Sequence, residues 1–243
     1  MQWDWNVIIN SMPKLLEGLI ITVELMTISV LLGLFFGLIL ALLRVHHSLW
    51  VKTLPFLYIF FFRGTPLLVQ LFLIYYGLSQ FEFVTNSVLW DSVLKQPYWC
   101  AIIAFTLNTS AYVAEIIRGA IESIPDGELD AADAIGMAPL QKLTRITIPR
   151  AFGIMLPAYS NEVIFMLKGS SLAMTIALMD ITGVAKTISA RTYTVFEMYF
   201  AAGVLYLILS WIILFGFRLL EKRFNRHHHY VPPDVATNTI PKI

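Results

Sequence analysis

The chain has almost no cysteine and lacks the usual marks of an enzyme. Cys100 is the only cysteine, which excludes an intrachain disulfide and disfavours a thiolate metal cluster. The phosphate-binding pattern G-x-x-x-x-G-K-[S/T] is missing, so we expect the chain neither to bind nor to hydrolyse ATP. There is also no credible Ser/His/Asp or Cys/His arrangement. These absences predict no catalytic residues, and no metal or cofactor bound by the chain itself.

Histidine is scarce, and the net charge is close to zero. The histidines are His46, His47 and the three consecutive ones at 227–229, all outside the long apolar runs, which argues against haem or quinone ligation in a membrane. The run at 227–229 can bind a metal adventitiously, but we interpret it as part of a solvated tail. The net charge of +1 gives no reason to expect a nucleic-acid partner.

Charged residues are few, whereas long apolar runs are abundant. Charged residues make up 14% of the chain, against about a quarter in soluble domains. Hydrophobic residues make up 58%, and the mean hydropathy is +0.72. Several apolar runs approach or exceed the roughly 20 residues that cross a bilayer core. A soluble helical protein would need more polar faces, so the composition predicts an all-α integral membrane protein.

The apolar runs predict five transmembrane helices. The N-terminal sequence MQWDWNVIINSMPK lacks the basic region and cleavage site of a secretory signal, so we expect the first run to remain as a membrane anchor. The predicted spans lie at about 19–43, 54–78, 98–117, 154–167 with flanking residues, and 199–220.

Two apolar stretches are irregular. The second span is interrupted by RGTP at 63–66, where Pro66 removes a backbone donor and Gly64 permits a bend, so its membrane segment can begin near this point. The stretch at 171–185 is short and contains Asp180. We expect an outer-face or re-entrant helix there rather than a sixth span.

Charge distribution favours five spans with the N-terminus outside and the C-terminus in the cytoplasm. A sixth span would place the basic cluster near 218–226 outside, against the positive-inside bias. The prediction is therefore a transmembrane domain at 1–223, a polar cytoplasmic insert at about 119–150 and a cytoplasmic tail at 224–243.

The cytoplasmic insert has the pattern of two short helices separated by a glycine. Pro125 and Asp126 suit a helix start, where the aspartate can accept from free N–H groups. Gly136 offers a left-handed end, and Pro139 can open a second, basic helix that returns to the membrane at Pro149. The alternative is a solvated loop that happens to be helical. The small pair Ala131-Ala132 instead favours close approach by another protein.

The spacing of the insert resembles a known family. D-A-A-x3-G-x9-I-x-I-P, from 130 to 149, is similar to the E-A-A-x3-G-x9-I-x-L-P loop of ABC-importer permeases, with departures at Asp130 and Ile148. FFRGTPLLVQL, AFTLNTSAYVAEIIRGAI and LPAYSNEVIFMLKGSSLA resemble the polar-amino-acid uptake group of these permeases. The likeness runs from about 15 to 223 and is greatest to the M-type membrane subunit of histidine/lysine/arginine/ornithine importers or their opine-uptake relatives.

The resemblance implies a fold, partners and a mechanism. It implies the type I ABC importer permease fold in the bacterial inner membrane and ATP-driven import of polar, chiefly basic, amino acids by alternating access. The implied partners are an ATPase dimer that uses ATP and Mg, a second permease subunit of the Q type and a periplasmic substrate-binding protein. The loop would form a coupling helix in a groove of the ATPase. The predicted coupling residues are Glu128, Asp130, Ala131, Ala132, Gly136 and Pro149.

Polar groups within the third and fourth spans predict a substrate path, because such groups are costly in a membrane. Asn161 and Glu162, together with Ser160, suit a cationic group. Asn108 and Tyr112 are four residues apart and share a helical face. The resemblance implies substrate contacts from these two spans, so we predict Asn108, Tyr112, Asn161 and Glu162 as substrate-binding residues.

Other interpretations remain open for the ionisable groups. Glu162 can instead form a structural pair with Lys168 or Arg63, or sit at the interface. Glu115 can pair with Arg118, and we interpret Glu24 as structural. An ATP-independent secondary transporter or channel subunit would explain Glu162 but not the insert. A membrane scaffold for a cytoplasmic complex would explain the insert but not the polar groups in the spans.

Overall fold

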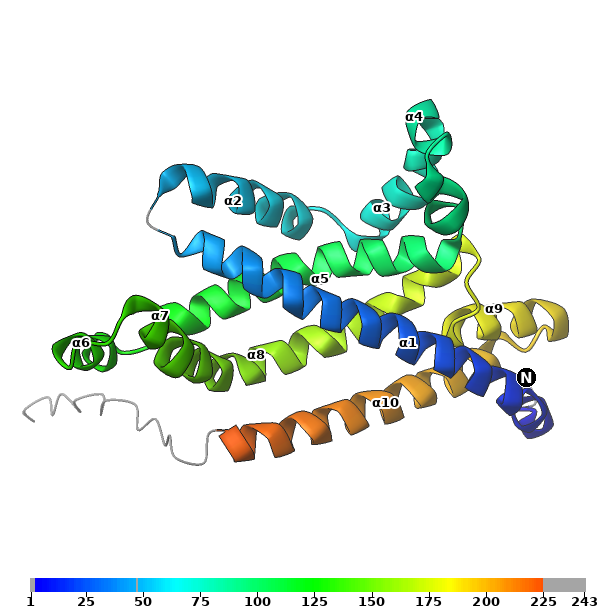
Figure 1. The fold of residues 1–243 in the computed structure, drawn as a ribbon. Coiled ribbons are helices and arrows are strands. Elements are labelled where there is room, and N and C mark those ends of the chain that lie inside the picture. The colour runs from blue at the N-terminus through cyan, green and yellow to red at the C-terminus, as the bar shows by residue number, and fades with distance from the viewer. Residues whose placement is uncertain (1–2, 47, 225–243) are drawn as a thin grey trace, which may run out of the picture.

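The computed structural model describes residues 3–46 and 48–224, and these contain helices but no strand (Figure 1). The predicted tail at 224–243 therefore lies outside the described residues except for Phe224, as do the three consecutive histidines and His47. The α-helices are α1 (Trp5–Arg44), α2 (Leu49–Gly64), α3 (Leu67–Phe72), α4 (Glu82–Thr85), α5 (Pro97–Glu122), α6 (Asp126–Ala134), α7 (Pro139–Lys142), α8 (Ile148–Gly169), α9 (Ile181–Thr192) and α10 (Val195–Phe224).

Helix α5 lies at the centre of the bundle. Of its apolar window, 72% is buried inside the protein, against 17% for α10 at the periphery. Helices α1 and α8 pack against α5, with α2 nearby (Figure 1). Cys100, Phe105 and Val113 on α5 are fully buried. Because α5 carries small residues such as Ala101 and Ala104 between them, neighbouring helices can approach closely.

Among the described residues, three helices are long and apolar enough to cross a membrane: α1, α5 and α10. The number of spans rises to as many as five if each of two bent helix pairs, Leu49–Gly64 with Leu67–Gln80 and Pro139–Ile176 with Ile181–Thr192, counts as one span. In Figure 1, α1, α5 and α10 run in one direction, and α2–α3 and α8 run in the other. Helix α1 begins at Trp5, well before the apolar run at 19–43. Its early turns bury Ile8 and Leu15 against α9 and α10, and tertiary packing therefore lengthens the helix.

The second predicted span is broken, as the sequence indicated. Helices α2 and α3 meet at an angle of 105°. Thr65 and Pro66 are extended, with ψ of 145° and 138°, because a residue before proline avoids the helical region. Gly64 is the last residue of α2 and has no positive φ. The expectation that Gly64 permits the bend is therefore wrong, and Pro66 alone accounts for the break.

The stretch at 171–185 is not a single helix. A 3-10 helix spans Ser170–Ile176, and α9 begins only at Ile181. The carboxylate of Asp180 caps α9 by accepting hydrogen bonds from the N–H groups of Thr182 and Gly183, at 3.2 and 2.9 Å. The predicted helix is corrected to two shorter ones, because Ala177, directly after the 3-10 helix, is left-handed with φ of 64°, and Asp180 caps the start of α9.

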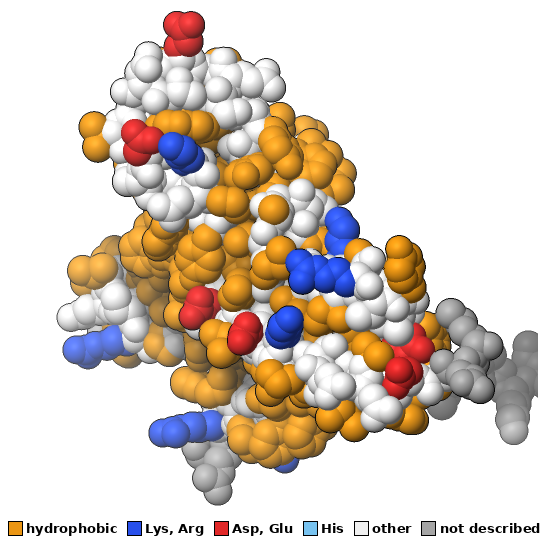
Figure 2. Space-filling view, turned by 90° about the vertical axis from the view of Figure 1, so that its right-hand side faces the viewer, with side chains coloured by type: hydrophobic (Ala, Val, Ile, Leu, Met, Phe, Trp, Pro, Cys, Tyr) orange, Lys and Arg blue, Asp and Glu red, His pale blue; other side chains and the backbone are white. Residues whose placement is uncertain are grey.

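Exposed apolar side chains cover the sides of the bundle. Phe35 on α1, Phe60 on α2 and Leu207 and Trp211 on α10 are at least 60% exposed. Figure 2, which faces the end with α3, α4 and α9, shows hydrophobic side chains gathered over broad areas, with isolated charges between them. Soluble proteins rarely expose such continuous apolar surface. These surfaces fit contact with lipid or with another membrane subunit.

Candidate functional site

A cavity of about 520 Å³ lies between α3, α5 and α8. The four residues that the sequence predicted as substrate-binding all line it, although they come from two helices: Asn108, Tyr112, Asn161 and Glu162. The other lining residues are Thr65, Pro66, Leu67, Ile116, Ala158, Phe165 and Met166. The helix break at Thr65 and Pro66 thus forms part of the cavity wall.

Glu162 is a buried carboxylate without a nearby cation. Its residue is 7% exposed, and Thr109 donates its hydroxyl to Oε1 at 3.0 Å. Among the described residues no cation lies within 4.0 Å of its carboxylate, so the alternative pairs with Lys168 or Arg63 are not formed. The carboxylate therefore keeps acceptor capacity for a group that enters the cavity.

Asn108 is held by a residue that sequence reasoning missed. Its Nδ2 donates to Oε1 of Gln70 at 2.9 Å and to the carbonyl of Phe62 at 3.4 Å. Gln70 is 2% exposed and lies on α3. One signal was available in the sequence, because Gln70 is the only amide within the apolar run LLVQLF, and a polar group there needs a partner.

Tyr112 separates the cavity from a second, smaller one. The second cavity has a volume of about 350 Å³ and is lined by Tyr112 together with charged and aromatic residues of α1, α2 and α5. The guanidinium of Arg63 lies 5.4 Å from the centre of the Tyr112 ring, a cation–π distance. Tyr112 is thus held between the main cavity and a basic cluster.

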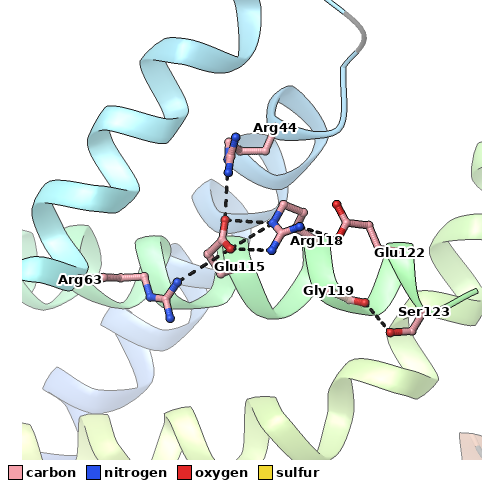
Figure 3. A network of polar contacts seen from close by, with 7 residues as sticks. All are labelled: Arg44, Arg63, Glu115, Arg118, Gly119, Glu122 and Ser123. Atoms are coloured by element: carbon pink, nitrogen blue, oxygen red, sulfur yellow. Dashed lines mark hydrogen bonds and ion pairs between the residues drawn. The ribbon is translucent and has the colours of Figure 1, made fainter. Parts of the chain in front are cut away.

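That cluster is an ion network around Glu115 (Figure 3). Glu115 pairs with Arg118 at 2.9 Å, with Arg44 at 3.7 Å and with Arg63 at 3.8 Å. Arg118 also pairs with Glu122. The predicted Glu115–Arg118 pair is confirmed, and the ends of α1 and α2 join it. The network ties three helices together at one end of the cavity.

Glu24 is an exposed residue of α1 that accepts a hydrogen bond from α5. Tyr98 donates its hydroxyl to Oε2 of Glu24 at 3.4 Å, between α5 and α1. This long hydrogen bond agrees with the structural interpretation of Glu24 and places it away from the cavity-lining residues.

The insert forms α6, a glycine turn and α7. Helix α6 begins at Asp126, and the N-cap residue is Pro125 without a side-chain cap bond. The expectation that Asp126 accepts from free N–H groups is therefore wrong, although Asp126 and Glu128 lie in the positive first turn. Glu128 instead accepts a hydrogen bond from Nη2 of Arg150 at 2.8 Å, which links α6 to the start of α8.

The glycine turn has the predicted geometry. Gly136 has φ of +75°. Its N–H donates to the carbonyl of Asp133 at 3.0 Å, and that of Met137 donates to the carbonyl of Ala132 at 3.1 Å, which is the Schellman pattern. Nζ of Lys142 on α7 donates to both carboxylate oxygens of Asp133, at 2.6 and 2.8 Å.

The two alanines of the insert face different ways. Ala132 is 2% exposed, so it packs inside the chain, whereas Ala131 and Asp130 are exposed. The expectation that both alanines present a surface to another protein is corrected accordingly. Ile135 and Leu140, 78% and 70% exposed, flank the glycine turn and were not predicted. Pro149 lies just beyond the π-helical turn Leu143–Thr147, at the point where the helical run from α7 continues into α8.

Comparison with known proteins assigns this arrangement to a family. The family described as binding-protein-dependent transport system inner membrane component matches residues 33–226. The chain belongs to this family, and it is a multi-pass permease subunit of an ABC importer in the inner membrane.

Several permeases are similar over most of their length. An octopine transport system permease protein, OccM of Rhizobium radiobacter, is 46% identical over 91% of this chain and 90% of its own. The histidine/lysine/arginine/ornithine permease HisM of Escherichia coli K12 is 40% identical over 86% of this chain and 88% of its own. The crystal structure of an amino acid ABC transporter with histidines matches with a TM-score of 0.81 and 35% identity, covering 92% of this chain and all of that one. The predicted type I permease fold is confirmed by this likeness.

Proposed function

We propose that the chain forms the membrane pathway of an ATP-driven uptake system for polar amino acids, with preference for a positively charged group. The observation that carries this proposal is the carboxylate of Glu162, which faces the cavity without a cation nearby. Histidine, lysine, arginine and ornithine, which the name of one similar permease gives, all have basic side chains. A cation in the cavity would compensate the buried charge.

The exposed face of α8 supports a path that a second subunit completes. Its exposed residues recur at three- and four-residue spacing: Ile154, Pro157, Ala158, Asn161 and Phe165. One helical face therefore runs from the cavity toward the insert. A partner permease subunit, which we expect to be a Q-type paralogue, would cover this face and close the pathway between the two chains.

The insert is suited to transmit motion to the cavity. Glu128 and Arg150 join α6 to α8, and α7 continues through the π-helical turn Leu143–Thr147 into α8. A displacement of α6 would therefore move the helix that carries Asn161 and Glu162. We assign ATP and Mg to a separate ATPase dimer that docks on Asp130, Ala131 and the glycine turn, and substrate delivery to a periplasmic binding protein.

The arrangement of helices supports five crossings. The start of α1 lies at the end that carries α9, and α10 ends near α6 and α7, so these two helix ends lie on opposite sides (Figure 1). The side with Arg44, Arg118 and Lys142 is the cytoplasmic one under the positive-inside rule.

Uptake of arginine and citrulline by the reconstituted complex tests the proposal. The two are nearly isosteric, but only arginine is cationic. The Glu162→Gln variant should lower the ratio of arginine to citrulline uptake about tenfold or more, because a hydrogen bond to a charged group contributes about 1.5–3 kcal/mol. Glu24→Gln is the matched control, since Glu24 lies outside the cavity.

Two outcomes would contradict the proposal. Equal loss of arginine and citrulline uptake in Glu162→Gln would show that Glu162 does not select for a charged substrate. Uptake that persists in vesicles without any ATPase subunit would instead favour a secondary transporter or channel.

A further inference from the structure

We propose that Gln70 is a positioning residue that sets the hydrogen-bonding polarity of the cavity, by turning the oxygen of Asn108 toward the substrate. The inference rests on the proposed function, because it concerns the selection of a cationic group by the same cavity. It adds a specific origin for that selectivity, the break between α2 and α3.

The break between α2 and α3 leaves a backbone carbonyl at the end of α2 without its usual helical donor. In a continuous helix, the carbonyl of Phe62 would accept from the N–H of residue 66. Residue 66 is proline and has no N–H. The carbonyl of Thr65, which is extended, also lies outside the helical ladder. Carbonyls unpaired in this setting are costly, because no bulk water reaches the interior of a membrane protein.

The amide of Gln70 satisfies both carbonyls. Its Nε2 lies 2.8 Å from the oxygen of Phe62, 3.0 Å from that of Thr65 and 2.7 Å from the hydroxyl oxygen of Thr65. The Thr65 hydroxyl donates to the carbonyl of Phe61, so its oxygen is a third acceptor near Nε2 of Gln70, and the two amide hydrogens are shared among three acceptors. Carbonyl oxygens can only accept, so the NH₂ group of Gln70 must face them. Its Oε1 must then point the other way.

Asn108 lies on that other side and takes the complementary orientation. Its Nδ2 donates to Oε1 of Gln70 at 2.9 Å, and the second amide hydrogen is directed to the carbonyl of Phe62 at 3.4 Å. Both amide hydrogens are therefore used within the protein. No donor from the described residues reaches Oδ1 of Asn108, and Asn108 is one of the residues that line the cavity. The orientation follows from the backbone and not from the asparagine itself.

The polarity of the cavity follows. Thr109 occupies one oxygen of Glu162, and the second oxygen receives no hydrogen bond from the described residues. The cavity thus presents the oxygen of Asn108 and the carboxylate of Glu162, both acceptors. The guanidinium of arginine can donate to both acceptors and balances the charge of Glu162. The neutral ureido group of citrulline leaves that charge uncompensated. Without Gln70, the Asn108 amide could turn its donors toward the ligand.

The test measures the arginine-to-citrulline uptake ratio of the reconstituted complex with Gln70→Met. Methionine has a similar length but no amide. We expect the ratio to fall about three- to tenfold, the effect of one oriented hydrogen bond. Gln80→Met is the matched control, because Gln80 is exposed and outside the cavity. An unchanged ratio in Gln70→Met would overturn the inference.

A double-mutant cycle separates positioning from general stability. If Gln70 acts through Asn108, adding Gln70→Met to Asn108→Leu should change the ratio no further. Additive effects would mean that Gln70 acts independently, and the inference would be wrong. If the wild-type complex itself shows no preference for arginine, the proposed function fails first, and the two failures are thereby distinguished.

A second pair of variants leaves Gln70 in place. In Asn108→Asp the carboxyl must keep a proton to donate to Oε1 of Gln70, so it adds little charge to the cavity. Asn161→Asp has no such partner among the described residues and adds a full charge. We expect the arginine-to-citrulline ratio to rise more in Asn161→Asp than in Asn108→Asp. An equal or larger rise in Asn108→Asp would contradict the positioning role.

Discussion

Two glutamates in neighbouring helices have opposite surroundings. Glu115 is paired with three arginines, whereas the only hydrogen bond to the carboxylate of Glu162 from the described residues comes from the hydroxyl of Thr109, with no cation within 4.0 Å. Both stand in apolar sequence, and the local difference between them is Arg118, which follows Glu115 by three residues. The difference arises because α1 and α2 end beside Glu115, at Arg44 and Arg63. A carboxylate with full pairing stabilises the fold, and one without it is available to a ligand.

Replacement of Glu115 should therefore affect stability and not selectivity. Glu115→Gln removes the anion that three neighbouring guanidinium groups share. The free energy of unfolding should therefore fall by about 1–3 kcal/mol. This corresponds to a fall in melting temperature of several degrees, at about 2–4 °C per kcal/mol. Thermal unfolding of the purified subunit measures it, with Glu122→Gln, a more exposed partner of Arg118, as the milder control. A changed arginine-to-citrulline ratio would place Glu115 in the substrate path instead.

The glycines at the two turns should differ in their tolerance of alanine. Gly136 has φ of +75°, a left-handed conformation that a residue with a side chain adopts only at about 1–2 kcal/mol of conformational free energy. Gly136→Ala should therefore destabilise the turn of the insert. Gly64 is helical, and a Cβ there would meet nothing within 4 Å. Gly64→Ala should leave stability and uptake unchanged. Co-purification of the ATPase checks the first variant, and normal association in Gly136→Ala would count against docking at this turn.

At the scale of elements, α1 and α5 are in close contact through glycines. A Cβ on Gly33 would lie 2.3 Å from Cγ2 of Thr109, and one on Gly37 would lie 2.9 Å from Cβ of Val113. The spacing is a G-x-x-x-G pair, which lets two membrane helices approach closely. Since Thr109 donates to Glu162, the packing of α1 also fixes a side chain of the cavity.

Gly33→Ala should consequently disturb both packing and substrate binding. Overpacking typically costs about 1–3 kcal/mol, and rotation of Thr109 would break its hydrogen bond to Glu162. The measurement is the melting temperature together with arginine uptake. Gly216→Ala on α10 is the control, because a Cβ there meets nothing within 4 Å. If both variants behave like the wild type, the contact between α1 and α5 is looser than described.

Hydrophobic runs in the sequence predicted where helices lie, but not where they begin and end. The apolar run predicted the helix over 19–43, yet α1 starts at Trp5 because its first turns pack on α9 and α10. The apolar residues at 171–185 predicted one helix, whereas the left-handed Ala177 ends the first helical segment and Asp180 caps the second. Pro66 predicted its break correctly, since a missing N–H acts in any context.

The candidate site was largely predictable, and its supporting residues were not. Polar residues in apolar runs stand out, so Asn108, Asn161 and Glu162 were found. Gln70 and Thr109 matter through contacts with partners 38 and 53 residues away, and a single sequence does not indicate such pairs. Orientation of an amide depends on the three-dimensional hydrogen-bond network.

At the scale of the whole molecule, the insert and the start of α1 lie at opposite ends of the helix bundle (Figure 1). The proposed membrane orientation rests on charge, because Arg44, Arg118 and Lys142 lie at the end with the insert. The second subunit, the ATPase and the binding protein would each contact a different part of this elongated bundle.

Single-cysteine labelling should reveal this orientation. Cys100 is fully buried and is the only cysteine, so Cys100→Ala gives a cysteine-free background. In it, Asp91→Cys should react with an impermeant thiol reagent from outside the cell, and Gln141→Cys only after permeabilisation. Both positions are exposed. Labelling of both residues from the same side would exclude five crossings.

The proline break also has an evolutionary consequence. The carbonyl of Phe62 is unpaired only while residue 66 is proline, and Gln70 is needed only while that carbonyl is unpaired. Loss of Gln70 alone leaves the carbonyl of Thr65 without its side-chain donor and that of Phe62 with only the longer bond from Asn108. Loss of Pro66 alone lets a backbone N–H compete with Gln70 for the carbonyl of Phe62. We therefore expect Pro66 and Gln70 to be retained or replaced together among related permeases.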